Sequence, residues 1–121
     1  MPLFDHEKLF VYQRAIEFVV WADNVLADLP KSMAVRGQLD RAATAIPLNI
    51  AEGNGKYQPN DRCRFFDIAR GSALECAACL DVAVAKKKVP QAVGKRGKAM
   101  LAEIVAMLVG LIRSNSPTRD I

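Results

Sequence analysis

The segment from Ala45 to Lys56, AIPLNIAEGNGK, contains a Gly-Asn-Gly-Lys run of the kind that could bind a phosphate group. A P-loop needs a glycine, four residues, a second glycine and then Lys-Ser or Lys-Thr, set between a strand and a helix. Here Ile50 stands five positions before Gly55, Tyr57 follows the lysine, and a helical pattern precedes the run. The sequence therefore argues against a nucleotide site. It predicts instead that Gly53 or Gly55 ends a helix in the left-handed conformation.

The same segment contains Asn49 and Glu52, which are three residues apart and share a helix face, and Arg70 is a possible partner for Glu52. A buried carboxylate is costly unless it is paired and hydrogen-bonded. We predict that these residues form a polar cluster between two helices. A catalytic Glu52 would instead have to lie exposed in a pocket with a strongly perturbed pKa, and no second acid, nucleophile or metal set accompanies it.

Cys76 and Cys79 have the C-x-x-C spacing of some zinc and redox sites. Zinc would need two more ligands, and the remaining candidates are Cys63 and His6. The pair falls inside a helical pattern among alanines, so we interpret both cysteines as small core residues. We expect no metal and no cofactor.

Basic residues gather between positions 86 and 98, where no acidic residue occurs. If two helices form a hairpin here, six cations meet at one end of the molecule: Lys86, Lys87, Lys88, Lys95, Arg96 and Lys98. Cations at a helix C-terminus also favour the helix dipole, but six exceed what capping needs. Such a patch can neutralise nucleic-acid phosphates, with strong salt dependence. We expect Arg62 and Arg64 to extend it.

Apolar residues recur at three- and four-residue steps and predict four helices, at about 6–29, 35–53, 60–87 and 92–113, with a disordered tail at 114–121. Short connections predict an all-α, up-and-down four-helix bundle that forms a single domain over residues 1–121. Pro47 should kink the second helix, because proline lacks an N–H and clashes with the carbonyl of residue 43. Gly94 and Gly97 argue against an early start of the fourth helix.

The chain of 121 residues has a net charge of +4, unevenly distributed. Residues 1–30 contain five acids against Lys8 and Arg14, a net of −3, so the remainder has +7. This asymmetry suggests an anionic partner or charge complementarity between subunits.

The apolar faces of the first and last helices are wider than one bundle core requires, which predicts a homo-oligomer. The apolar run Ile104–Ile112 is too short for a membrane span, and no secretory signal is visible, so we expect a cytoplasmic protein.

Three stretches between about residues 8 and 85 resemble the four-helix-bundle family of proteins encoded by intervening sequences in bacterial 23S ribosomal RNA genes. That family includes the accessory protein of diversity-generating retroelements. The stretches are KLFVYQRAIEFV, QLDRAATAIPLNIAEGNGK and RFFDIARGSALEC. Within them the family pattern fits in order and spacing at Gln38, Arg41-Ala42, Ile46-Pro47, Asn49 to Gly53, Ala69 to Ser72, and Glu75.

The resemblance implies a four-helix bundle that commonly assembles as a ring-like pentamer, without a characteristic enzymatic activity. In the retroelement branch it implies a basic surface that engages nucleic acid and a reverse transcriptase. Asn49, Glu52, Arg70 and Glu75 correspond to signature residues, which agrees with the polar cluster. The chain departs from the pattern at Asp40, where the family usually has a basic residue, and after Glu75, where Cys76 and Ala77 replace a second nearby acid.

We therefore predict a non-enzymatic, oligomeric accessory protein that binds RNA or DNA through its basic patch, with a protein such as a reverse transcriptase as a further partner. The alternative is a protein–protein interaction scaffold whose patch docks an acidic protein. The sequence leaves open the choice between RNA and DNA, the identity of the partner and the number of subunits.

Overall fold

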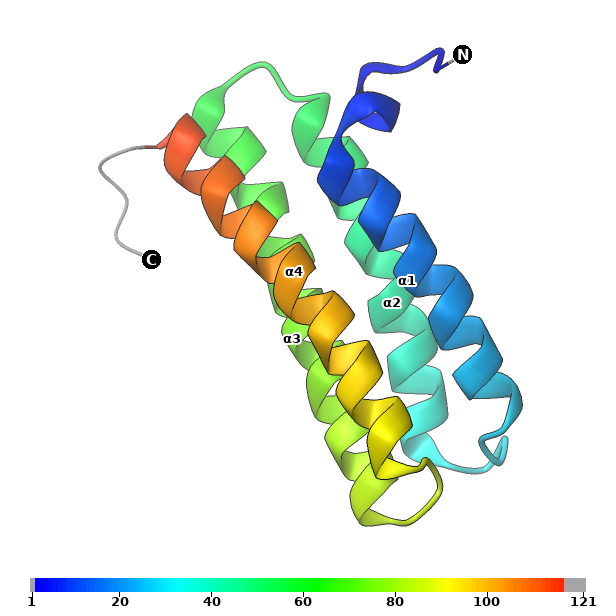
Figure 1. The fold of residues 1–121 in the computed structure, drawn as a ribbon. Helices are drawn as coiled ribbons and strands as arrows, with labels where there is room; N and C mark the ends of the chain where they lie inside the picture. The colour runs from blue at the N-terminus through cyan, green and yellow to red at the C-terminus, as the bar shows by residue number, and fades with distance from the viewer. Residues whose placement is uncertain (1, 117–121) are drawn as a thin grey trace.

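The computed structural model describes residues 2–116, and this part of the chain contains helices and no strands. A short 3-10 helix, η1 (Asp5–Lys8), precedes four long helices: α1 (Phe10–Ala27), α2 (Ala34–Asn54), α3 (Pro59–Ala85) and α4 (Gln91–Asn115). The helices run alternately up and down (Figure 1). The predicted all-α four-helix bundle is confirmed. Of the tail expected at 114–121, Ser114 and Asn115 belong to α4, and positions 117–121 lie outside the described residues.

One apolar core joins the four helices, and its largest fully buried side chains include Phe18, Leu39, Phe66, Leu80 and Leu108. These residues lie on the apolar stripes that the sequence periodicity indicates, and removing them from water drives the association of the helices. No helix within residues 2–116 is long and apolar enough to span a membrane.

α2 is continuous from Ala34 to Asn54, with Pro47 buried in its interior, so the predicted kink at this proline is not confirmed. Its end also differs from the prediction. Gly53 is the last residue but one of the helix, and the cap Gly55 has a φ of −81°. Neither glycine is left-handed, since no glycine of residues 2–116 has a positive φ.

The packing of α2 and α3 explains the first of these glycines. A Cβ on Gly53 would lie 2.8 Å from Cε1 of Phe66, so only glycine lets α2 approach α3 this closely. The expected left-handed cap at this position is therefore wrong: a requirement for close tertiary packing, and not for an unusual φ, places glycine here.

Gly94 and Gly97 also lie inside a helix, as the predicted range 92–113 requires, and α4 begins at Gln91 although these glycines argued against an early start. A Cβ on Gly94 would lie 2.6 Å from Cγ2 of Val84, and a Cβ on Gly97 would overlap the Trp21 ring and lie 2.7 Å from Cδ1 of Leu80. Both glycines are buried. The cost of glycine in a helix is offset because α4 can then pack directly against α1 and α3.

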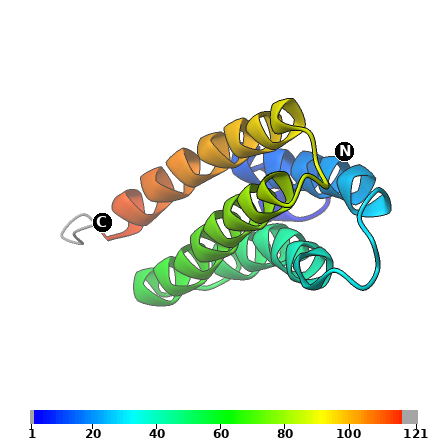
Figure 2. The ribbon, with the colours of Figure 1, turned by 90° about the horizontal axis from the view of Figure 1, so that it is seen from below.

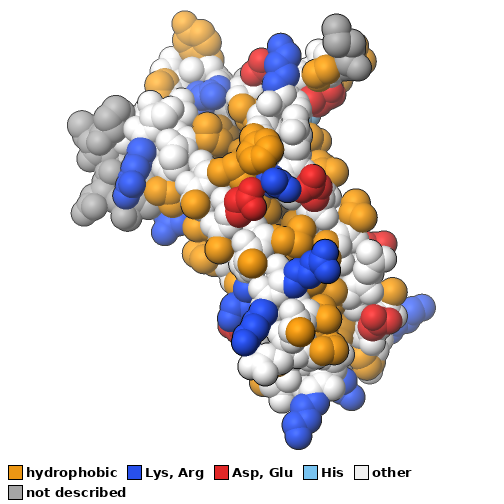
Figure 3. All heavy atoms as spheres, in the orientation of Figure 1, with side chains coloured by type: hydrophobic (Ala, Val, Ile, Leu, Met, Phe, Trp, Pro, Cys, Tyr) orange, Lys and Arg blue, Asp and Glu red, His pale blue; other side chains and the backbone are white. Residues whose placement is uncertain are grey.

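α1 and α4 make the least extensive contact between neighbouring long helices, and Figure 2 shows them diverging. Arg14 bridges the two helices. Its Nε lies 3.1 Å from Oε1 of Glu103 on α4, and its Nη1 lies 2.9 Å from Oε2 of Glu17 on α1. The guanidinium also covers the Phe10 ring at 4.8 Å. Figure 3 shows acidic and basic side chains next to one another on the face formed by α1 and α4. Ion pairs as exposed as those of Arg14 contribute little free energy.

We expect Gly97→Ala to lower the free energy of unfolding by about 1–3 kcal/mol, because the new methyl group forces Trp21 or Leu80 out of position. Gly71→Ala is the matched control, since a Cβ at this exposed position in α3 meets nothing within 4 Å. It should stabilise the protein by about 0.5–1 kcal/mol through helix propensity alone. Urea unfolding of both variants measures the difference. Equal effects would contradict the packing role of Gly97.

Candidate nucleic-acid interface

The connection between α3 and α4 spans Lys86 to Pro90 and makes the two helices a hairpin. The six cations of the basic patch are therefore at one end of the bundle. Lys98 is the cation of this group that lies farthest along α4. It is seven residues after the first residue of the helix, which places it about 10 Å along the helix axis from that end. We call this patch, which consists of Lys86, Lys87, Lys88, Lys95, Arg96 and Lys98, the lysine-rich end. All six side chains are exposed.

α3 ends in a Schellman motif. The Lys88 N–H donates to the Ala83 carbonyl at 2.9 Å, and the Lys87 N–H donates to the Val84 carbonyl at 2.9 Å. The left-handed position of this motif, which is usually glycine, is occupied by Lys87, with a φ of 59°. It is the one non-glycine residue in residues 2–116 with a positive φ. A left-handed lysine costs roughly 1–2 kcal/mol, so a cation stands here at the expense of stability.

Two hollows lie beside this turn. One, of about 580 Å³, is bounded by Lys87, Lys88 and Gln91 together with apolar residues. The other, of about 150 Å³, is bounded by Asp81, Gln91, Lys95 and Lys98. Lys98 donates to Asp81 at 2.7 Å, so its charge is largely neutralised within the chain. The other five cations form no ion pair within the described residues.

The fold adds a cation that the sequence reasoning missed. The α1–α2 connection lies at the same end of the bundle as the α3–α4 connection (Figure 1). It contains Lys31, which is exposed. The expected up-and-down topology could have predicted the position of Lys31, because that topology brings the first and third connections to one end of the bundle.

Arg62 and Arg64 do not extend the lysine-rich end. Both lie in the first turns of α3, and Arg62 is 24 residues before Lys86, about 36 Å away along the helix. The expectation that they adjoin the lysines is wrong, because a continuous helix separates the two groups. Arg64 is exposed, with its guanidinium 4.8 Å from the Phe65 ring centroid and 3.9 Å from the Asp61 carboxylate.

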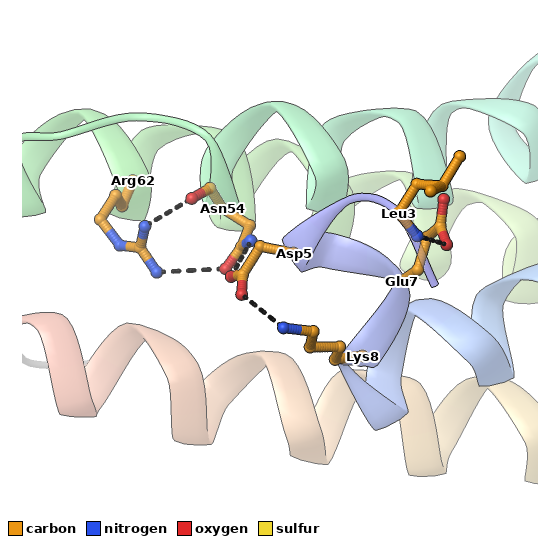
Figure 4. Close-up of polar contacts among 6 residues, drawn as sticks. All are labelled: Leu3, Asp5, Glu7, Lys8, Asn54 and Arg62. Atoms are coloured by element: carbon orange, nitrogen blue, oxygen red, sulfur yellow. Dashed lines mark hydrogen bonds and ion pairs between the residues drawn. The ribbon is translucent and has the colours of Figure 1, made fainter. Parts of the chain in front are cut away.

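Arg62 ties together the other end of the bundle. Its Nη1 donates to the carbonyls of Asn54 at 2.7 Å and Lys56 at 3.2 Å, and its Nε donates to Oδ1 of Asn115 at 3.0 Å. Asn54 in turn donates to Asp5 at 2.9 Å. Figure 4 shows this connection from Arg62 through Asn54 to Asp5 and Lys8. The guanidinium thus satisfies carbonyls at the end of α2 and links η1, α2, α3 and α4.

The polar cluster expected from Asn49, Glu52, Arg70 and Glu75 is not held together within the chain. No hydrogen bond or ion pair between any two of these side chains occurs within residues 2–116. Asn49 donates to the Ala45 carbonyl at 2.8 Å, and Arg70 Nη1 lies 3.9 Å from Asp67. Glu52 and Glu75 are exposed.

The expectation that Glu52 is buried against Arg70 is therefore wrong. The buried stripe of α2 passes through Ile46, Ile50 and Gly53. Successive residues of a helix point about 100° apart, so the residue before Gly53 turns away from the core. Glu52 is directed outward, and the rest of the helix determines this direction.

The three cysteines are free thiols buried in the core. Burial raises the pKa of Cys76 to about 12, with smaller contributions from Cys79 and Glu75. Burial likewise raises the pKa of Cys79. A thiol with a raised pKa stays protonated at neutral pH and is a poor nucleophile and metal ligand. Among the described residues, no group of three or more His, Cys, Asp or Glu side chains could hold a metal ion.

We expect Lys87→Gly to raise the free energy of unfolding by about 0.5–1 kcal/mol, because glycine relieves the left-handed strain but loses more entropy on folding. Lys88→Gly is the control, since it removes the same charge where no strain exists, and it should destabilise by about 0.5–1 kcal/mol. Thermal unfolding distinguishes the two variants. A Lys87→Gly variant that is less stable than the unchanged protein would contradict the backbone strain at this position.

Arg62→Ala should lower the free energy of unfolding by about 2–3 kcal/mol, because it leaves the backbone carbonyls of Asn54 and Lys56 without this donor. Arg64→Ala, two residues away on the same helix, should change it by less than about 0.5 kcal/mol, since its ion pair is exposed. Chemical denaturation of the two variants tests this contrast, and similar losses would show that Arg62 does not hold this end together.

Comparison with known proteins agrees with this fold. A family model described as 23S rRNA-intervening sequence protein matches residues 7–110. A crystal structure of a protein of unknown function from the S23 ribosomal protein family of Bacteroides thetaiotaomicron VPI-5482 has a TM-score of 0.81 to this chain at 23% sequence identity, over 85% of this chain and 98% of that chain. The comparison with curated proteins gives no match. The match to the family model confirms the resemblance seen in the sequence, and the chain belongs to the 23S rRNA-intervening sequence protein family.

Proposed function

We propose that this protein is a non-enzymatic accessory protein that binds the phosphates of a structured RNA through its lysine-rich end. The observation that supports this most is the cluster of six exposed cations in the α3–α4 connection and the first turns of α4, only one of which is paired with an acid within residues 2–116. Phosphate contacts of this kind supply affinity without reading sequence. The family description, which refers to 23S rRNA, favours RNA as the first ligand to test.

The strained Lys87 supports the same proposal. Glycine would be more stable at this turn, and a lysine held in the left-handed region places an ammonium group at the tip of the hairpin. Strain of this kind persists where the residue serves a purpose other than stability. The neighbouring hollows, bounded by Lys87, Lys88, Lys95 and Lys98, offer room for phosphate groups between the side chains.

We further propose that the protein acts in the cytoplasm as a homo-oligomer, with five copies by resemblance to its family, and that a protein such as a reverse transcriptase is a further partner. Several copies in one assembly would present several lysine-rich ends to one RNA. Linked sites of modest affinity then bind far more tightly than one alone.

The proposal is tested by titrating the purified protein with a structured RNA and with duplex DNA from about 50 to about 200 mM salt. Six phosphate contacts predict that the affinity falls roughly a thousandfold over this range. Lys86, Lys87 and Lys88 replaced together by alanine should reduce the slope of log affinity against log salt by about 2.7, or about 0.9 for each contact.

The control replaces three cations at the opposite end of the bundle, Lys8, Lys56 and Arg113, and so removes the same net charge. Its salt slope should stay close to that of the unchanged protein. Equal losses from both triple variants would indicate attraction by net charge without a defined surface. If neither RNA nor DNA binds at about 50 mM salt, the nucleic-acid proposal is contradicted, and an acidic protein becomes the favoured ligand of the lysine-rich end.

A further inference from the structure

A groove of about 370 Å³ runs along the outer side of α3 and α4, and its lining is almost entirely apolar. The walls are Leu74 and Ala77 from α3 and Leu101, Ala102, Val105 and Ala106 from α4. Leu74 is 51% exposed, so a large apolar side chain stands beside small ones. The groove is therefore shaped to receive apolar side chains, and nothing within residues 2–116 fills it. We call it the α3–α4 groove.

Cations mark the two ends of this groove. Lys98 lines one end. Arg70 lies at the other, because it precedes Ala73 and Leu74 by three and four residues and so shares their face of α3. The Nε of Arg70 is buried and has no hydrogen-bond partner within the described residues, and its Nη1 is no closer than 3.9 Å to Asp67. Lys98 already donates to Asp81, so an occupant with a carboxylate beside its apolar side chains would chiefly complement the Arg70 end.

The outer face of α1 has these properties. Ile16 and Val20 are four residues apart, 40% and 61% exposed, and form an apolar ridge. Glu17 and Asp23 flank the ridge and are also exposed, and Glu17 is in addition paired with Arg14 of the same helix. The first 30 residues have a net charge of −3, while the rest of the chain has +7. We call Ile16, Glu17, Val20 and Asp23 the α1 ridge.

One chain cannot seat its own ridge in its own groove. α1 and α3 are diagonal in the bundle, and among the described residues no Cα atom of one comes within 8 Å of the other, so the α1 ridge and the α3–α4 groove face in different directions. Figure 2, seen from below the bundle, shows α1 separated from α3. The ridge of another copy is free to reach the groove.

We propose that the α1 ridge of one copy occupies the α3–α4 groove of the next, so that each copy contributes two different surfaces to the assembly. This inference rests on the proposed homo-oligomer and names the surfaces that form it. Apolar side chains at i and i+4 enter a groove as the anchors of a helix do. Such a contact is heterologous, so it repeats from copy to copy and closes into a ring when the rotation allows.

The experiment uses two variants, each of which disables one surface. Val20→Lys places an ammonium group in the centre of the ridge, and Ala102→Lys fills the groove with a charged side chain. Both positions are exposed in one chain, so each variant should retain its helical circular dichroism. Each alone should be a monomer by sedimentation, with self-association weakened at least about 100-fold. Mixed in equal amounts they should form a dimer of one copy of each, because the intact ridge of one meets the intact groove of the other.

Thr44→Lys is the control, since it adds the same charge on an exposed position of α2 outside both surfaces. It should assemble like the unchanged chain. A mixture that stays monomeric, a variant that assembles normally, or an unchanged chain that is itself monomeric would each overturn this inference. RNA binding is measured separately, so an oligomer that binds no RNA would leave this inference standing and remove only the nucleic-acid proposal.

Discussion

The close approach of α4 to α1 and α3 at Gly97 is the constraint on which this bundle depends. Trp21 from α1 and Leu80 from α3 both occupy the space where a side chain of residue 97 would be. One turn earlier, Gly94 admits Val84 in the same way. Because these contacts lie near the α3–α4 connection, they fix the angle at which the hairpin turns. They thereby hold the three lysines of the α3–α4 connection beside the three cations in the first turns of α4.

The two ends of the bundle are built on different principles. At one end a Schellman motif satisfies the last carbonyls of α3 through the backbone, and the side chains of Lys86, Lys87 and Lys88 stay exposed. At the other end Arg62 satisfies the carbonyls of Asn54 and Lys56 with its own side chain. A guanidinium occupied in this way has little capacity left for a ligand. The distinction explains why cations of similar appearance in the sequence have different roles in the fold.

Much of the fold could be predicted because helix periodicity and motif spacing are local properties of the chain. The predicted helix boundaries are mostly within two or three residues of the observed ones, except at the start of the first, where η1 precedes α1. The candidate site was harder to predict. Glu52 was expected to be buried against Arg70 because it shares a helix face with Asn49, yet its direction is set by Ile46, Ile50 and Gly53 on the same helix. Arg62 was expected to bind a ligand because it is basic, and it proved to be a structural donor.

By itself the sequence determined that this chain is an all-α bundle of a recognisable family, with a run of cations between residues 86 and 98. Those features follow from periodicity, composition and residue order, which are local properties and do not depend on contacts with distant segments of the chain. Only the tertiary structure decided that the glycines inside α2 and α4 admit neighbouring helices, and that Arg62 donates to backbone carbonyls while Lys86, Lys87 and Lys88 stay exposed. These depend on contacts between residues distant in sequence, where packing overrides the local preference that a sequence pattern records.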